Sequence, residues 1–157
     1  MTVYRSPLVR VATKGYLGWK LDTRYIRKLV RETAGNIQRD STALLEGSTG
    51  AGRLWYRPGG GQYRASAPGA LPARRTGHLA QSILARVSKR DGLKAWIGPS
   101  RGSYKKGEFY PEFLISGRDQ IERRLSATSV AGRKHLARFS RELRKAMEKG
   151  IKPEAAK

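Results

Sequence analysis

The chain has 157 residues, with 33 lysines and arginines against 12 aspartates and glutamates, and a formal net charge of +21. Its length suits a single domain spanning 1–157, and the lack of cysteine excludes disulfides and thiolate metal sites. No apolar run approaches the roughly 20 residues that cross a bilayer, so we expect no membrane contact and synthesis in the cytoplasm. So large a positive charge indicates an anionic partner rather than a particular fold.

The first regular element is predicted to be a long helix that follows an N-terminal arm over residues 1–20. Apolar side chains recur at three-to-four spacing from Leu21 to Leu45, which predicts an amphipathic helix from Asp22 to Glu46. Gly47 opens a Gly- and Ser-rich run that favours the end of that helix. The polar face of the helix carries Arg24, Arg27, Lys28 and Arg31.

A strand, an extended loop and a short helix are predicted next. The aromatic run from Arg53 to Pro58 favours a strand that ends at its proline. Residues 57–75 contain too much Gly and Pro for regular structure, so we expect a long extended loop there. Thr76 is a favourable N-cap for a short helix that contains Leu79 and Ile83.

A β-hairpin and two further helices complete the predicted elements. The pair Asp91-Gly92 separates two β-compatible runs and predicts strands over residues 84–89 and 93–98. A short helix is expected over 108–116. After a break around residues 126–129, a second amphipathic helix is expected over 132–150, with 151–157 as a frayed tail. The apolar face of that last helix comprises Leu136, Phe139, Leu143, Ala146 and Met147.

These elements predict an α+β fold. The hairpin, with one or two further strands, forms a small antiparallel sheet that packs against the N-terminal and C-terminal helices. A long Gly/Pro-rich arm interrupts the order of elements between the first helix and the hairpin.

The sequence offers little that could carry catalysis. The two histidines, His78 and His135, have no metal-ligand spacing around them. Glu108 and Glu112 stand four residues apart, a spacing better explained by helix capping or solvation than by acid–base work. Neither glycine-rich run carries the GxxxxGK[ST] pattern of a phosphate-binding loop. We therefore predict no catalytic residue, no metal and no cofactor.

Basic and aromatic residues alternate at several places, among them Trp55-Tyr56-Arg57 and Tyr104-Lys105-Lys106. Such runs suit contact with nucleic acid through phosphate neutralisation and stacking, and they suit acidic neighbours in an assembly equally well. No known nucleic-acid-binding module accompanies them. The candidate contacts to DNA or to an acidic surface are Arg24, Arg27, Lys28, Arg31, Lys105, Lys106, Arg138, Arg141 and Arg144.

The order of elements, together with one motif, resembles the tail-completion (head–tail joining, neck) family of long-tailed bacteriophages. That family carries a Pro-Gly-x-x-Pro arm followed by Thr-Gly-x-Leu-x-x-Ser-Ile, matched here by 68–72 and 76–83. A Tyr-x-x-Phe-x-Glu-x-Gly-Thr segment is matched loosely by 110–117, where Ile115-Ser116-Gly117-Arg118 replaces the end of the pattern. The Arg-Pro-Phe-Leu that usually precedes the last helix is missing.

The resemblance implies a non-enzymatic structural protein of the virion, assembled in the host cytoplasm. It would form a homo-hexameric ring at the head-proximal end of the tail and join the tail to the head connector. The implied partners are a tail terminator or tail-tube protein, neck or adaptor proteins, and DNA in the lumen. The alternative is a free basic nucleic-acid-binding protein. The expected subunit or partner contacts are Tyr63, Arg64, Pro68, Gly69, Pro72, Arg74, Arg75 and Thr76.

Overall fold

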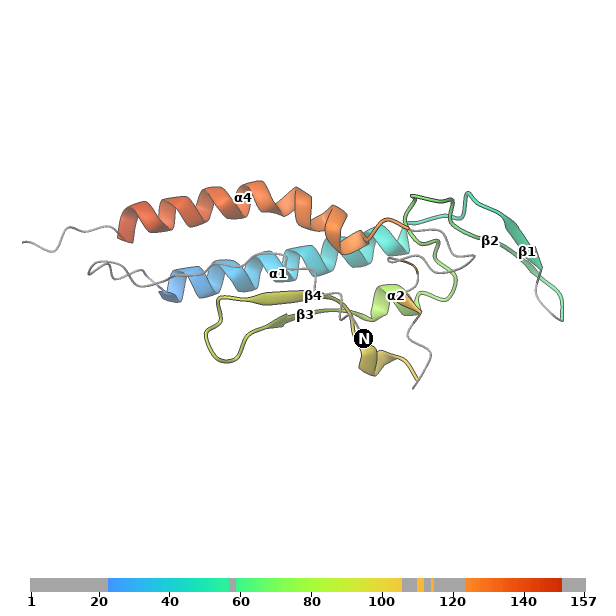
Figure 1. Ribbon diagram of the computed structural model, residues 1–157, viewed down its shortest axis with the longest axis horizontal. Helices are drawn as coiled ribbons and strands as arrows, with labels where there is room; N and C mark the ends of the chain where they lie inside the picture. The colour runs from blue at the N-terminus through green and yellow to red at the C-terminus, as the bar shows by residue number, and fades with distance from the viewer. Residues whose placement is uncertain (1–22, 57–58, 106–109, 112–113, 115–123, 151–157) are drawn as a thin grey trace, which may run out of the picture.

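The computed structural model describes residues 23–56, 59–105, 110–111, 114 and 124–150. It has the predicted α+β fold, in which helices accompany two antiparallel sheets of two strands each. Helix α1 (Thr23–Glu46) lies between α4 (Ala127–Gly150) on one side and a β-hairpin on the other (Figure 1). The N-terminal arm, the C-terminal tail, Lys106 and most of the short helix predicted over 108–116 lie outside the described residues.

Helix α1 ends at Glu46, as its apolar periodicity predicted, and begins at Thr23; the predicted first residue, Asp22, lies outside the described residues. Its buried side chains recur every three or four residues and therefore form one stripe along the helix. Ser41 lies within that stripe, and its hydroxyl donates a hydrogen bond to the carbonyl of Ile37. The helix ends where Gly47 N–H bonds to the carbonyl of Ala43 at 2.9 Å. The buried stripe comprises Ile26, Val30, Ala34, Ile37, Ser41 and Leu45.

Helix α4 begins five residues earlier than the sequence analysis predicted, at Ala127 rather than Gly132. The Ser- and Thr-containing stretch that we interpreted as a break is instead the first turn. Ser126 stands before it, and its carbonyl accepts from Ser129 N–H at 3.0 Å and from Val130 N–H at 3.1 Å. Its hydroxyl also contacts Thr128 Oγ1 at 2.8 Å. Serine is favoured at this position because it can satisfy backbone groups that the first turn leaves unpaired.

The β3–β4 hairpin confirms the signal from Asp91-Gly92, although its strands are shorter than predicted. β3 (Ile83–Val87) pairs antiparallel with β4 (Ala95–Pro99). The connection between them is closed by a 2.8 Å hydrogen bond from Ser88 N–H to the Lys94 carbonyl. Because side chains alternate across a strand, one face packs on α1 while Leu84 and Trp96 lie on the other face and are exposed. The inner face comprises Ile83, Ala85, Val87, Ala95 and Ile97.

The core lies where α1 meets both neighbours. At one end of α1, Ile26 and Val30 contact Phe139 of α4, and apolar residues of the hairpin pack around them. At the other end, Leu45 packs with Ile83 and with the first residues of α4. Between these clusters an apolar cavity of about 50 Å³ lies among α1, β4 and α4. Its lining includes Val30, Ala34, Ile37, Ala95, Leu136 and Phe139.

Two predictions for the segment before the hairpin were wrong. The short helix α2 spans His78–Gln81, and Ile83 belongs to β3 rather than to the helix. Gly77, in the left-handed conformation with φ +78°, occupies the N-cap position that we assigned to Thr76. The Thr76 hydroxyl still accepts a 3.3 Å hydrogen bond from His78 N–H, so the capping chemistry is present one residue further from the helix.

Candidate interface on the Gly/Pro-rich arm

The segment between α1 and α2 contains a second β-hairpin, which corrects the prediction of an irregular loop over residues 57–75. β1 (Leu54–Tyr56) pairs antiparallel with β2 (Gln62–Arg64). Gly59, Gly60 and Gly61, which had indicated irregular structure, have φ between +87° and +96°. Such angles strain other residues, so these glycines allow the chain to reverse direction between the two strands. We call residues 54–64 the ribbon.

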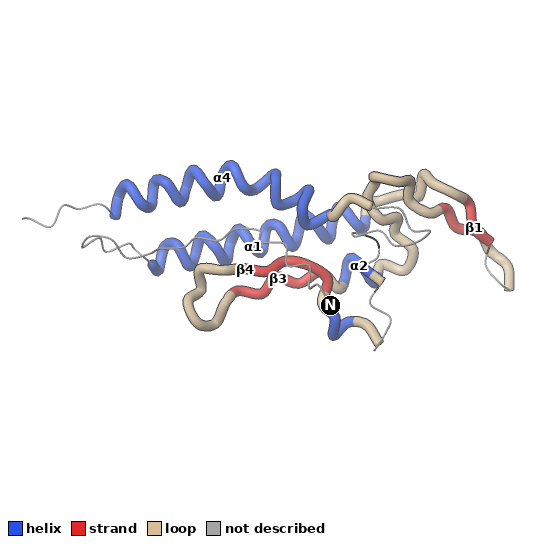
Figure 2. The backbone as a smooth tube through the Cα atoms, viewed as in Figure 1, coloured by secondary structure: helices blue, strands red, loops and turns tan. Residues whose placement is uncertain are grey.

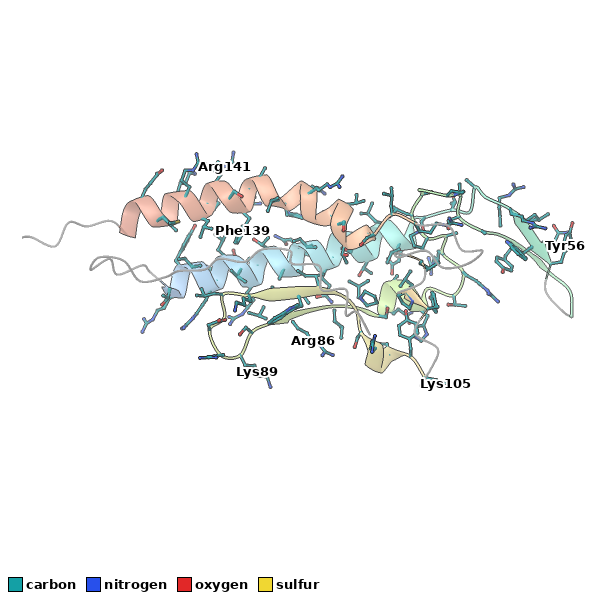
Figure 3. The ribbon with its side chains drawn as sticks, in the orientation of Figure 1. Tyr56, Arg86, Lys89, Lys105, Phe139 and Arg141 are labelled. Atoms are coloured by element: carbon teal, nitrogen blue, oxygen red, sulfur yellow. The ribbon has the colours of Figure 1, made fainter. Side chains whose placement is uncertain are left out.

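The ribbon projects beyond one end of the helical body and lies away from α1 and α4 (Figures 1 and 2). Trp55 faces Tyr63 across the strands, so the two rings share one face. Tyr56 lies on the opposite face, where its side chain is 70% exposed, and Trp55 is 45% exposed. Figure 3 shows Tyr56 at the outer part of the ribbon. The ribbon therefore presents aromatic surface on both faces.

An arginine lies over each ring on the first face. The guanidinium carbon of Arg53 is 4.9 Å from the centroid of Trp55, and that of Arg75 is 4.7 Å from the centroid of Tyr63. Arg53 precedes Trp55 by two residues and so projects to the same face. Arg75 comes from outside the ribbon, from the residues just before α2. The two cation–π contacts hold these guanidinium groups in place.

The base of the ribbon is fixed by close backbone packing. Gly52 N–H bonds to the Ala65 carbonyl at 2.7 Å, and Ala65 N–H bonds to the Arg53 carbonyl at 2.9 Å. A Cβ atom on Gly50 would lie 2.0 Å from the Arg64 carbonyl oxygen, and one on Gly52 would lie 2.5 Å from that of Ser66. Only glycine permits an approach this close.

The residues after the ribbon are hydrogen-bonded to the residues that flank both long helices, and we call residues 65–74 the root. Ser48, just past α1, donates through its hydroxyl to the Pro72 carbonyl. Just before α4, Leu125 N–H bonds to the Ala70 carbonyl at 2.9 Å, and Arg124 Nε donates to Ser66 Oγ at 2.8 Å. The root therefore belongs to the folded body, while the ribbon stands clear of it.

The predicted contact residues divide between the ribbon side and the root. Tyr63 and Arg75 come together in the cation–π contact, and Arg64 is exposed on the other face of the ribbon. Pro72 is buried within the chain, so it supports the root and is not available to a partner. The remaining predicted contacts, Pro68, Gly69, Arg74 and Thr76, are exposed.

The predicted anion contacts do not form one patch. Arg141 of α4 lies on the side away from α1, whereas Lys105 lies on the opposite side of the body (Figure 3). Several of the predicted contacts already have partners within the chain: Arg27 Nε bonds to the Asp91 carbonyl, Lys28 lies 3.8 Å from Glu32, and Arg141 lies 3.9 Å from Glu142. The exposed members of the set are Arg24, Arg27, Lys28, Arg31, Lys105, Arg138, Arg141 and Arg144.

Sequence reasoning missed an aromatic cluster beneath α2. The His78 ring lies 4.6 Å from that of Tyr104, which in turn meets Tyr110 edge-on at 5.4 Å. Burial, together with the neighbouring Tyr104 hydroxyl, raises the pKa of Tyr110 to about 12. Ser82 Oγ lies 2.9 Å from the Tyr104 hydroxyl and donates to the Leu79 carbonyl, so its partners include no catalytic base. The cluster packs the chain around residue 104 against α2.

A cluster of charged side chains joins the two long helices. Asp40 of α1 accepts hydrogen bonds from Lys134 Nζ at 2.7 Å and from His135 Nε2 at 3.0 Å, both on α4. These two bonds hold the pKa of the Asp40 carboxyl below its ordinary value, with the Lys134 bond as the larger cause. In the part of the chain that the structure describes, no group of three or more His, Cys, Asp or Glu side chains could hold a metal ion. Nor is any described helix long and apolar enough to cross a membrane.

Comparison with known proteins leaves the chain without an assigned relative. No protein-family model matches the sequence, no curated protein matches it, and no solved structure matches the fold.

Proposed function

We propose that this chain is a non-enzymatic structural protein of a bacteriophage virion, a tail-completion or neck protein. In this proposal copies of the chain form a ring at the head-proximal end of the tail and join it to the head connector. The observation that carries the proposal is the ribbon, which projects from a root bonded to the residues that flank both long helices and leaves Trp55 and Tyr56 exposed. Exposed aromatic surface on a projecting element is typical of a contact between proteins.

The distribution of charge also supports an assembly rather than a free nucleic-acid-binding protein. A protein that binds a duplex with one face gathers its cations on that face. Here exposed cations lie on opposite sides of the body, as Arg141 and Lys89 illustrate. A ring of chains that each carry +21 would repel itself unless anionic neighbours surrounded it. Acidic tail and neck proteins, or DNA in the lumen, would supply that compensation.

The test is to co-express the chain with the products of its neighbouring genes and to examine the particles by electron microscopy. A ring that contains the chain at the end of a tail, or between a tail and a head connector, would support the proposal. The informative variant replaces residues 55–63 with a short Gly-Ser link, because this deletion removes the ribbon and leaves the buried Ser66 and Pro72 of the root intact. We expect a folded chain that no longer joins the particle.

A matched control tests whether removal of an exposed aromatic side chain elsewhere has the same effect on particle assembly as removal of the ribbon. Trp96→Ala removes a ring that is 54% exposed on the outer face of the other hairpin. We expect this variant to join particles as the unmodified chain does. A chain that never appears in particles, but binds duplex DNA tightly at physiological salt, would overturn the proposal in favour of the nucleic-acid alternative.

A further inference from the structure

We propose that the ribbon docks on an acidic surface of a different protein, with Arg53 and Arg75 pairing with carboxylates beside the exposed rings. This inference rests on the proposed function and adds to it the chemistry of one partner. A lone two-stranded hairpin is marginal in water, and strands of three residues are among the shortest that occur. Burial of Trp55, on the face that carries Arg53 and Arg75, would stabilise a hairpin that is marginal by itself.

The charge of this part of the chain selects an acidic partner. Residues 47–77 contain five arginines and no aspartate, glutamate or lysine. Arginine differs from lysine in presenting a planar fork of donors that pairs with a carboxylate through two hydrogen bonds. The guanidinium groups of Arg53 and Arg75 lie over Trp55 and Tyr63, and both arginines are exposed, so their donors can reach the carboxylates of a partner.

Nucleic acid fits the same surface less well. Non-specific binding of single strands uses aromatic faces as platforms for bases, and here a guanidinium already lies over the Trp55 ring and another over the Tyr63 ring. β1 and β2 also pair only with each other among the described residues, so each has an outer edge of backbone donors and acceptors. A strand of another protein can pair with such an edge, whereas a nucleic acid cannot.

A second copy of this chain is also a poor partner, because several of the carboxylates in its described residues already have cationic partners. Asp40 bonds to Lys134 and His135, and Glu142 lies 3.3 Å from Lys145. Glu32 lies 3.8 Å from Lys28. A copy would in addition bring a net charge of +21 toward the ribbon. The partner is therefore a protein of opposite charge.

The experiment titrates the full-length, isotope-labelled chain with a peptide of alternating glutamate and valine and follows its backbone and indole N–H signals by NMR. We expect the largest shifts at the Trp55 indole and along β1 and β2, and smaller shifts at the Trp96 indole. The double variant R53Q/R75Q should weaken binding by about tenfold or more, because it removes both charge-assisted pairs with carboxylates. The control K89Q/R90Q removes the same charge from the β3–β4 connection and should weaken binding less than about threefold.

A second double variant keeps the inference testable if R53Q/R75Q disturbs the structure of the ribbon. R53K/R75K keeps both charges and loses the planar fork, so binding should again weaken. Equal binding by R53K/R75K and the unmodified chain would overturn the inference, because net charge alone would then suffice. Equal weakening by R53Q/R75Q and K89Q/R90Q would overturn it for the same reason.

Two further outcomes would identify a different occupant and so overturn the inference. Oligodeoxythymidylate could shift the ribbon signals at lower concentration than the peptide does, or dilution of the chain alone could shift them. These titrations use the isolated chain and so fail independently of the particle experiment. Ribbon-specific peptide binding by a chain that never enters particles would sink the proposed function alone, whereas particle assembly by R53Q/R75Q at the normal level would sink the docking inference alone.

Discussion

Arg27 Nε of α1 donates a 2.8 Å hydrogen bond to the backbone carbonyl of Asp91, at the turn of the β3–β4 hairpin. The aliphatic part of Arg27 also lies under Gly92, the next residue in that turn. One residue that we predicted to contact an external anion thus helps to hold the hairpin on the helix.

Gly92→Ala should destabilise the fold. Gly92 has φ +67°, and an added Cβ would lie 3.0 Å from Arg27 Cγ. The left-handed conformation alone costs about 1–2 kcal/mol for a residue with a Cβ, so we expect a loss of at least this size in the free energy of unfolding. Urea denaturation measures it. Gly98→Ala is the control, because it has no positive φ and its Cβ would meet no atom within 4 Å. An equal loss at both positions would contradict this account.

Phe139→Ala and Leu136→Ala should differ sharply although both residues lie on the predicted apolar face of α4. Phe139 is 5% exposed and packs against Ile26 and Val30, whereas Leu136 is 45% exposed at the edge of the cavity. We expect a loss of about 3–5 kcal/mol for Phe139→Ala. The loss for Leu136→Ala should stay near 1 kcal/mol or below. Denaturant unfolding of the two variants side by side measures the difference, and similar losses would show that the core is placed wrongly.

Acid should destabilise the unmodified chain partly through Asp40. Its hydrogen bonds from Lys134 and His135 lower its pKa in the folded state from the ordinary value of 3.8. The contribution is complete above that ordinary value and is lost as pH falls through the lowered one. Asp40→Asn should therefore flatten the decline of the melting temperature below about pH 4. Glu32→Gln, which removes another α1 carboxylate, should leave the decline in place; a parallel effect of the two variants would argue against a special role for Asp40.

Tyr110 should ionise at a higher pH than a tyrosine with the ordinary pKa. Its pKa is raised to about 12, first by burial and then by the charge and hydroxyl of Tyr104. A raised pKa stabilises the folded state fully below the ordinary value of about 10 and progressively less as pH rises toward 12. In a spectrophotometric titration, Tyr104→Phe should lower the pKa of Tyr110 without restoring its ordinary value. Tyr56→Phe, which alters an exposed tyrosine, should not move it.

The elements with a regular apolar pattern were predictable from the sequence. The elements that depend on an unusual backbone conformation or on a helix cap were not. The apolar spacing of α1 and the alternation around Asp91-Gly92 each have one simple structural solution, and both predictions were confirmed. β2 was missed because Gly59 to Gly61 indicated irregular structure, although in a left-handed conformation they allow a hairpin. The first turn of α4 was missed because the Ser- and Thr-containing stretch at residues 126–129 is as typical of a break before a helix as of a helix N-terminus.

The candidate interface was only partly predictable. We predicted the interface on the Gly/Pro-rich segment, and two of its predicted residues, Tyr63 and Arg75, do contact each other. These two residues are twelve positions apart in the sequence, so no local pattern could have paired them. Pro68 and Pro72 belong to the same Gly/Pro-rich stretch, yet Pro68 is exposed and Pro72 is buried in the root, where its carbonyl accepts a hydrogen bond from Ser48. Which prolines face outward depends on tertiary contacts that the sequence does not display.

The separation of the ribbon from the body implies that the chain unfolds in two steps. The hydrogen bonds between β1 and β2 have no long helix packed over them, so the ribbon can open while α1 and α4 stay together. Its amides should exchange with solvent on a faster timescale than those of the buried stripe of α1. A partner that binds the ribbon would slow that local exchange and leave the global exchange of the helices unchanged.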